Sequence, residues 1–342
     1  MSRLVVEEAG PATSVQDCGR IGVLRFGLSS AGAMDRQALA VANVLVGQPA
    51  DAAAIEIGPF GARFSAADGA IRLALSGAAR DAAIDGQPVA AARSFVLPAG
   101  AKLALRPARN GTFTYMAIEG GIAGHKVFGS LSVHARAGIG SPIARPLAAG
   151  DELPVTAATP RAETRLPLPA PDDGPIRIVL GPQDDHFDPA EIARFLDAEW
   201  RIAPASDRMG YRLAGPKITC ARGYNIVSDG IANGHIQIPG SGEPLVLLAD
   251  RGTTGGYPKI GAIITADLGR FAQTPVGKPL RFAAVDVGTA QTLARAWQAG
   301  LDSLPARLET LSGLSPSSEA LLAQNLAGGA VSALDTDTWS HS

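Results

Sequence analysis

Residues 244–264 read PLVLLADRGTTGGYPKIGAII, two apolar runs separated by a polar, glycine-rich loop. Short continuous apolar runs that are bounded by turn residues are typical of strands covered on both faces. Closed or nearly closed barrels bury strands in this way. The stretch therefore predicts a β protein that presents a polar loop, residues 250–259, between two buried strands.

Further strands are expected where apolar and polar residues alternate, at residues 70–75, 102–105, 113–118 and 280–283. The chain contains 40 Gly and 25 Pro in 342 residues, which favours tight turns between short strands. We therefore expect a mainly β fold with a few short helices.

Three helices have identifiable ends. Asp35 can cap a helix over residues 36–46, which carries one apolar stripe. Asp188 and Glu191 form a capping-box-like start to a second helix, and a third is expected over residues 290–299.

Two lobes are the expected domain organisation. A chain of this length with 46% apolar residues can bury two ordinary cores. The proline-rich segment 156–175 suits an extended connector. We expect an N-terminal lobe over residues 1–160, a C-terminal lobe over 175–300, and a helical or frayed tail over 301–342.

Composition and motifs exclude several classes of protein. The net charge of −2 lacks the basic excess of nucleic-acid binders. No apolar run is long enough to cross a membrane, and the first residues turn acidic early, so we expect a cytoplasmic protein. The sequence contains no GxxxxGK[ST] phosphate loop, GxSxG elbow, HExxH helix or CxxC pair. No metal site is expected, since the acidic cluster at residues 183–186 is more typical of solvated or capping groups.

Three tracts combine glycines with polar side chains inside apolar sequence, at residues 13–35, 206–213 and 234–259. They are the candidates for a site. The candidate residues are Gln16, Asp17, Arg20, Asp35, Arg208, Arg212, Gln237, Asp250, Thr254, Gly255, Gly256, Tyr257 and Lys259, with Asn43 from the first helix.

These tracts resemble the allophanate hydrolase subunit 2 family, also called the KipA or biotin-dependent carboxyltransferase-like family. Its members include the C subunit of bacterial ATP-dependent 5-oxoprolinase. The resemblance runs from about residue 4 to residue 286, through further phrases at residues 42–47, 55–57, 120–122, 181–183 and 266–268. One departure stands out: where many relatives read Gly-Ser-Arg-Ser-Thr, residues 129–133 read Gly-Ser-Leu-Ser-Val, so a cation is missing.

The resemblance implies two cyclophilin-like β-barrel lobes that bind a KipI-like partner. With a third, LamB-like partner, such a pair opens the lactam of 5-oxo-L-proline to L-glutamate, using ATP with Mg at the level of the complex. Relatives also form the carboxyltransferase part of urea carboxylase and allophanate hydrolase systems, with biotin on a separate carrier. A third alternative is a regulatory antagonist of a KipI-like kinase inhibitor.

Both implied substrates are small amides, which offer a carbonyl acceptor and an N–H donor. Lys259 and Asp250, at the two ends of one loop, are the expected catalytic pair. Gly255 and Gly256 would let the backbone approach the ligand closely. A substrate carboxylate would be held by a bidentate arginine, either Arg208 or Arg212.

Each candidate also has a purely structural interpretation. Gly255 and Gly256 would form a turn between two strands. Arg208 would join Asp207 in a surface pair of little energetic value. Asp35 would be only a helix cap. Hydrogen bonds to nearby backbone or loops would explain the others near the N-terminus, namely Gln16, Asp17, Arg20 and Asn43.

Overall fold

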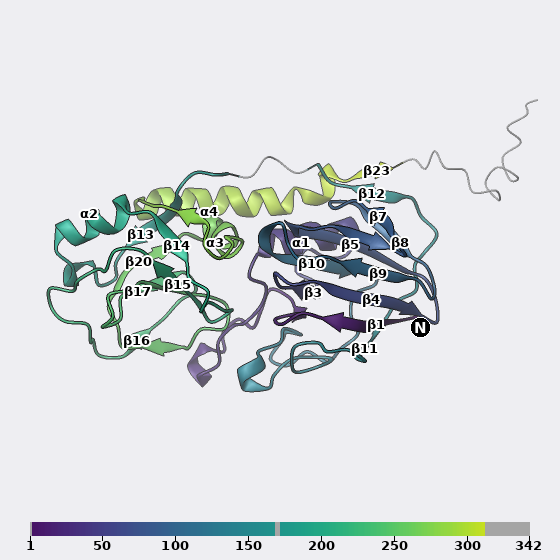
Figure 1. Ribbon diagram of the computed structural model, residues 1–342, viewed down its shortest axis with the longest axis horizontal. Coiled ribbons are helices and arrows are strands. Elements are labelled where there is room, and N and C mark those ends of the chain that lie inside the picture. Colours follow the sequence, from purple (N-terminus) through teal and green to yellow (C-terminus); the bar gives the residue numbers. More distant parts are fainter. Residues whose placement is uncertain (1, 168–171, 312–342) are drawn as a thin grey trace, which may run out of the picture.

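The computed structural model describes residues 2–167 and 172–311. Figure 1 shows two β lobes side by side, with the long helix α4 (Val287–Asp302) running along the upper edge of both. The expectation of a mainly β fold built from two barrel-like lobes with a few helices is confirmed. None of the helices in the described ranges has the length and apolar character needed to cross a membrane.

The N-terminal lobe consists of two antiparallel sheets. One has six strands in the order β11-β1-β4-β9-β6-β7, and the other has five in the order β2-β3-β10-β5-β8. Their bounds are β1 Ser2–Ala9, β2 Ser14–Gln16, β3 Ala54–Ile57, β4 Ala62–Ala67, β5 Ile71–Ala79, β6 Ala82–Ile84, β7 Gln87–Val89, β8 Ser94–Leu97, β9 Lys102–Leu105, β10 Asn110–Ile118 and β11 Glu152–Val155.

The C-terminal lobe is one eight-stranded sheet in the order β21-β14-β15-β18-β17-β20-β13-β22, beside the short pair β16-β19. Within it, β13 and β22 run parallel and the other pairs run antiparallel. The bounds are β13 Ile176–Leu180, β14 Trp200–Ile202, β15 Gly210–Ala214, β16 Asp229–Gly230, β17 His235–Gln237, β18 Leu245–Leu247, β19 Thr254–Gly255, β20 Lys259–Ile263, β21 Pro279–Leu280 and β22 Phe282–Ala284.

Helix α1 (Arg36–Leu45) lies at the junction of the two lobes. Every residue from 38 to 45 is buried, because α1 packs on β5 and β10 on one side and approaches α3 (Thr265–Ala272) on another. Its apolar side chains belong to the same buried cluster as the core of the C-terminal lobe. The two lobes therefore share a core across α1.

The predicted helices exist with different ends. The first helix ends at Leu45, one residue early, and Asp35 caps it as expected. In α2 (Pro189–Asp197) the capping box is wrong: the side chain of Asp188 makes no capping bond, and Glu191 accepts instead from Thr219 N at 2.9 Å. Helix α4 is longer than the expected residues 290–299.

The other differences concern the connector, one strand and the tail. Within segment 156–175, β12 (Glu163–Arg165) pairs with β23 (Glu309–Leu311), so the connector contains a strand and the start of the tail supplies its partner. The predicted strand 280–283 divides between β21 and β22. The rest of the tail that was expected to be helical or frayed, residues 312–342, falls outside the described residues.

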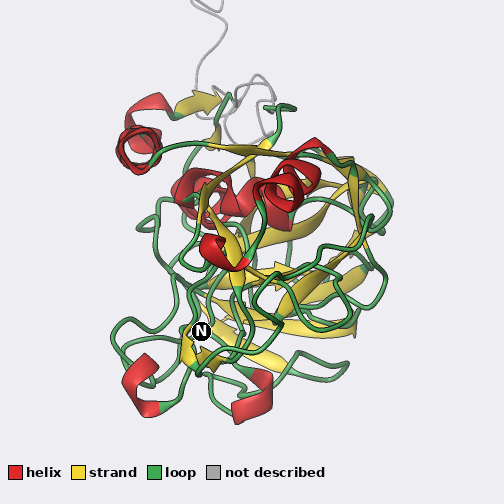
Figure 2. Cartoon of the chain, turned by 90° about the vertical axis from the view of Figure 1, so that its left-hand side faces the viewer, coloured by secondary structure: helices red, strands yellow, loops and turns green. Residues whose placement is uncertain are grey.

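Single-turn helices η1 (Leu24–Phe26) and η2 (Ala135–Ala137) lie on the lower side of the molecule in Figure 1, opposite α4. The longer helices gather along the other side of the strands (Figure 2). Two more short turns belong to the second half of the chain: η3 (Asp184–His186) precedes α2, and η4 (Leu304–Arg307) follows α4.

Candidate functional site

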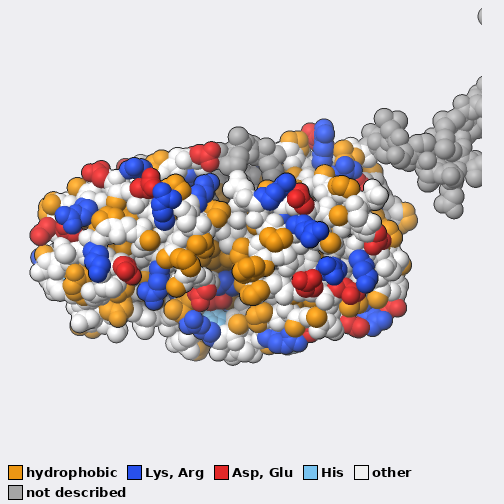
Figure 3. Space-filling model, in the orientation of Figure 1, with side chains coloured by type: hydrophobic (Ala, Val, Ile, Leu, Met, Phe, Trp, Pro, Cys, Tyr) orange, Lys and Arg blue, Asp and Glu red, His pale blue; other side chains and the backbone are white. Residues whose placement is uncertain are grey.

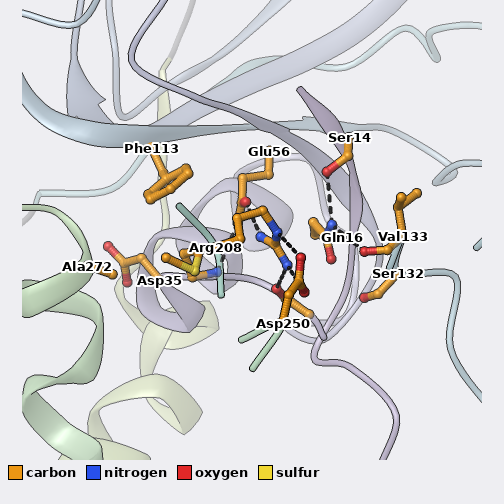
Figure 4. Close-up of polar contacts among 12 residues, drawn as sticks. Ser14, Gln16, Asp35, Glu56, Phe113, Ser132, Val133, Arg208, Asp250 and Ala272 are labelled. Carbon is orange, nitrogen blue, oxygen red and sulfur yellow. Dashed lines mark hydrogen bonds and ion pairs between the residues drawn. The ribbon is translucent and has the colours of Figure 1, made fainter. Parts of the chain in front are cut away.

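Arg208 joins the two lobes through a buried ion-pair network (Figure 4). Its Nε and Nη2 donate to the two carboxylate oxygens of Asp250 at 2.9 and 3.0 Å. Its Nη1 donates to Glu56 on β3, and Nη2 also donates to Gly32 O at 2.8 Å. The Arg208 guanidinium is thus bound by groups of its own chain. This argues against the predicted bidentate contact with a substrate carboxylate. It also argues against the interpretation of Arg208 as half of a surface pair.

Glu56 is fully buried and is held from several sides. Besides Arg208, it accepts a hydrogen bond from the hydroxyl of Tyr115 at 2.6 Å and from Met34 N at 2.9 Å. Burial and the Glu56 charge raise the pKa of Tyr115 well above its usual value. Although burial alone would lower it, Glu56 and Asp250 together raise the pKa of Arg208, so the guanidinium stays charged.

Asp35 acts as the cap of α1 and as a contact between lobes. Its Oδ1 accepts from Gln37 N and Ala38 N, both at 3.1 Å, and its Oδ2 accepts from Gln273 Nε2 at 3.0 Å. Burial raises the pKa of this carboxyl. The geometry favours the structural interpretation of Asp35.

Asp17 organises the loop that contains residues 129–133. Its carboxylate accepts from the hydroxyls of Ser130 and Ser132 and from the backbone of Gly19 and Leu131, at 2.5 to 2.8 Å. Leu131, at the position of the missing cation, is buried in the core of the N-terminal lobe. Its side chain therefore supports packing.

Gln16 and Arg20 are bound to the same loop. Gln16 Nε2 donates to Val133 O at 3.0 Å, and Arg20 Nε donates to Val127 O at 3.2 Å. Figure 4 draws Gln16, Ser132 and Val133 in the same view as Asp250 and Arg208. The space-filling view shows a hollow between the lobes with charged and histidine atoms at its base (Figure 3).

Lys259 forms a second polar cluster inside the C-terminal lobe. The residue is fully buried, and its Nζ donates to Asp229 Oδ2 at 2.8 Å while its backbone N donates to Gln183 Oε1 at 3.1 Å. Asp229 is half exposed. Nearby, burial and the Lys259 charge lower the pKa of His235 to about 4.

Gly255 lies against a neighbouring side chain. A Cβ at this position would stand 2.4 Å from Gln237 Nε2, so any larger residue would push the Gln237 amide aside. The close approach predicted for a ligand is made here by Gln237, whose Nε2 has no hydrogen-bond partner among the described residues. Gly255 also pairs with Asp229 across β16 and β19, and Tyr257 is 40% exposed at the surface.

The structure therefore places most of the predicted residues in two groups and gives the two members of the expected catalytic pair different partners. Asp250 is bound to Arg208, and Lys259 to Asp229. Arg212 projects to solvent from β15. Asn43 is buried and donates to Ala52 O at 2.7 Å, as its structural interpretation predicts. The junction group contains Gln16, Asp17, Arg20, Asp35, Arg208 and Asp250, and the second group contains Gln237, Thr254, Gly255, Gly256 and Lys259.

Sequence reasoning missed several partners of these residues. Glu56 carried a usable signal, since it is a lone acid inside an apolar strand. The others, Tyr115, Asp229 and Gln273, show no such pattern. In the described ranges no three His, Cys, Asp or Glu side chains gather closely enough to hold a metal ion.

The match to known proteins agrees with this two-lobed architecture. A family model for the carboxyltransferase domain, subdomains A and B, matches residues 26–284, and the chain belongs to this family. It is 38% identical to the C subunit of 5-oxoprolinase from Escherichia coli over 282 residues, covering 82% of this chain and 90% of the relative. The corresponding protein of Haemophilus influenzae is 35% identical over 292 residues, covering 85% and 94%.

A solved structure extends the likeness to a larger enzyme. The crystal structure of the K. lactis urea amidolyase superposes with a TM-score of 0.81 at 26% identity, over 93% of this chain. The chain spans only 20% of that enzyme.

Proposed function

We propose that this chain is one component of an ATP-dependent 5-oxoprolinase, which converts 5-oxo-L-proline, ATP and water to L-glutamate. The observation that carries the proposal is the 35–38% identity to proteins named as the C subunit of 5-oxoprolinase, over 90–94% of their length. We further propose that it acts in the cytoplasm with KipI-like and LamB-like subunits.

The geometry supports a role for Lys259 in amide chemistry. Opening a lactam builds negative charge on the carbonyl oxygen, and a positioned cation in a dry site stabilises that charge. The Lys259 ammonium is fully buried and has one charged partner, Asp229, which reaches it from the half-exposed β16. Movement of β16 would expose the ammonium to a substrate.

The Arg208 network has a different task. Because its charge is paired with Glu56 of the N-terminal lobe and with Asp250, it holds the lobes in register. We assign it to positioning.

ATP with its Mg ion belongs to the assembled complex in this proposal. The chain has no phosphate loop, and the described residues present no glycine-rich turn ahead of a lysine and a helix where phosphates would bind. The residues present in the described ranges therefore do not fit a nucleotide.

The test is co-expression with the KipI-like and LamB-like proteins. We expect the purified three-part complex to form glutamate from 5-oxo-L-proline and ATP, and the chain alone to form none. A stable, complete complex without turnover would reject the proposal. A Lys259→Met variant should lower kcat at least about 100-fold, by analogy with loss of one oxyanion donor, while the exposed Lys278→Met control retains activity.

A carboxyltransferase component is the second candidate, favoured by the superposition on the urea amidolyase. It would transfer CO₂ from biotin on a separate carrier to an amide nitrogen. Turnover that requires bicarbonate and a biotinylated protein would decide for it.

A further inference from the structure

Two buried polar atoms on the segment that begins in β2 have no hydrogen-bond partner among the described residues. They are Gln16 Oε1, an acceptor, and Arg20 Nη1, a donor. Gln16 is 0% exposed and Arg20 is 1% exposed. Leaving such groups unpaired away from water is costly, so an unpaired donor and acceptor on one short segment indicate a missing partner.

The rest of both side chains is fixed. Gln16 Nε2 donates to Ser14 Oγ at 2.9 Å and to Val133 O at 3.0 Å. These two bonds fix the orientation of the amide and leave Oε1 without a donor. Arg20 Nε donates to Val127 O and Nη2 to Ser132 O. Both side chains are therefore anchored to residues 127–133, with one free atom each.

Arg20 also lacks a direct ion pair among the described residues. No carboxylate lies within ion-pair distance of its guanidinium in the described part of the chain. Asp17 and Asp250 are the nearest negative charges, and burial still lowers the pKa of Arg20 in spite of them. Buried charges are normally paired. A carboxylate bound at Nη1 would supply the direct ion pair that Arg20 lacks.

Two other buried arginines in the N-terminal lobe have more of their hydrogen bonds or a carboxylate nearby. Arg80 also has no carboxylate partner, but its donors bond to Thr114 Oγ1 and to four backbone carbonyls. Arg72 has unbonded nitrogens, but Glu119 lies 3.5 Å from its Nε. Among these three, only Arg20 lacks both a carboxylate within ion-pair distance and a full set of hydrogen bonds.

We infer that Arg20 Nη1 and Gln16 Oε1 form a subsite for a carboxylate with an adjacent N–H group, and that it selects 5-oxo-L-proline over amides without a carboxylate. This rests on the proposed function and names the substrate groups that the junction recognises. In 5-oxoproline the lactam nitrogen and the carboxylate are attached to one carbon. The carboxylate would accept a hydrogen bond from Arg20 Nη1, and the lactam N–H would donate to Gln16 Oε1.

Both atoms are closed to solvent in this structure, so binding requires the covering segments to part. The segment after Arg20 offers such a movement, because Ile21 and Phe26 are 89% and 65% exposed and belong to neither buried core cluster. Urea, which has no carboxylate, would leave Arg20 uncompensated.

The test compares 5-oxo-L-proline with 2-pyrrolidinone, the same lactam without its carboxylate, in the assembled enzyme. For the wild type we expect KM for 5-oxoproline to lie at least about 30-fold below the inhibition constant of 2-pyrrolidinone, as loss of a buried charge partner predicts. Arg20→Lys should raise KM for 5-oxoproline at least about tenfold and leave 2-pyrrolidinone inhibition unchanged, because lysine keeps the charge and loses the fork. The matched control is Arg80→Lys, which should leave the preference between the two ligands at the wild-type value.

N-methyl-5-oxoproline tests Gln16 without a substitution, and the wild type should bind it at least about tenfold more weakly than 5-oxoproline. Equal binding of the lactams with and without the carboxylate by the wild type would overturn the inference. An equal weakening of the binding of both ligands in Arg20→Lys would also overturn it. That result would indicate that an internal water accepts the free hydrogen bond of Arg20. If the wild type still forms glutamate in those cases, the proposed function stands; if it forms none and binds no 5-oxoproline, both fail.

Discussion

Arg208 is the side chain through which the C-terminal lobe reaches Glu56 in the N-terminal lobe. Removing one partner of a buried ion pair strands the other charge away from water. We expect Arg208→Ala to lower the free energy of unfolding by about 3–5 kcal/mol, measured by denaturant titration.

The control for this substitution lies four residues away. Arg212 is exposed, and only its backbone N makes a hydrogen bond, to Ser206 Oγ. Arg212→Ala should change stability by less than about 0.5 kcal/mol. Equal losses for the two variants would show that the Arg208 network does not hold the lobes.

His235 reports on the charge of Lys259. Burial, and then the positive charges of Lys259 and Arg251, lower the pKa of the imidazole to about 4, and its Nδ1 accepts from Ala232 N at 3.0 Å. NMR titration should find His235 neutral at pH 6. In the Lys259→Met variant the midpoint of the His235 titration should move to higher pH. An unchanged midpoint would mean that Lys259 carries no charge near His235.

The lowered pKa of His235 also makes the stability of the folded protein depend on pH. The unfolded imidazole titrates at about 6.5, so the His235 contribution is fully present above that pH. It is lost as the pH falls from 6.5 toward 4, because the unfolded chain then binds a proton that the folded chain does not.

At this scale the sequence identified both residues of the Arg208–Asp250 contact but missed Glu56 and Asp229. Polar tracts inside apolar sequence pointed to Arg208, Asp250 and Lys259. Their partners Glu56 and Asp229 lie 152 and 30 residues away from Arg208 and Lys259, and no local pattern encodes such pairings. The expected pair of Lys259 with Asp250 rested on loop proximity alone.

Helix ends provide a matched comparison at the scale of elements. Asp286 caps α4 by accepting from Thr289 N at 2.8 Å, whereas the side chain of Asp188 makes no bond at the start of α2. We expect Asp286→Ala to cost about 1 kcal/mol of stability and Asp188→Ala to cost clearly less, both measured by thermal unfolding. A larger loss at Asp188 would contradict the assignment of these caps.

Elements with capping or alternating patterns were predictable, and those shaped by distant contacts were not. Helix α1 was predicted with its cap because Asp35 and the apolar stripe are local signals. Helix α3 was missed because it starts after Ile264 without a capping side chain. Strand β12 was missed because it exists through pairing with β23, more than a hundred residues later.

Gln273 connects the lobes at the scale of the whole molecule. Its Oε1 accepts from Thr112 N and Phe113 N at 2.9 Å, and its Nε2 donates to Phe113 O and to Asp35 Oδ2. Gln273→Ala leaves these two backbone amides without an acceptor. We expect faster hydrogen exchange at Thr112 and Phe113 in the variant, with Gln298→Ala on the exposed face of α4 as the unaffected control.

The two-lobed organisation could be predicted from the connector and from strand patterns, but the closeness of the lobes could not. The two lobes are held together by a shared core across α1, by the Arg208 network and by Gln273. Because the described residues contain no phosphate loop for the ATP of the proposed reaction, we propose that this chain forms part of a site that its partners complete.

The most direct measurement follows glutamate formation by the purified three-part complex, supplied in parallel with 5-oxo-L-proline and ATP or with urea, bicarbonate, ATP and a biotinylated carrier. We predict ATP-dependent glutamate formation that needs this chain and is indifferent to biotin. Consumption of urea that depends on bicarbonate and the carrier, with no glutamate from 5-oxoproline, would contradict the proposed function.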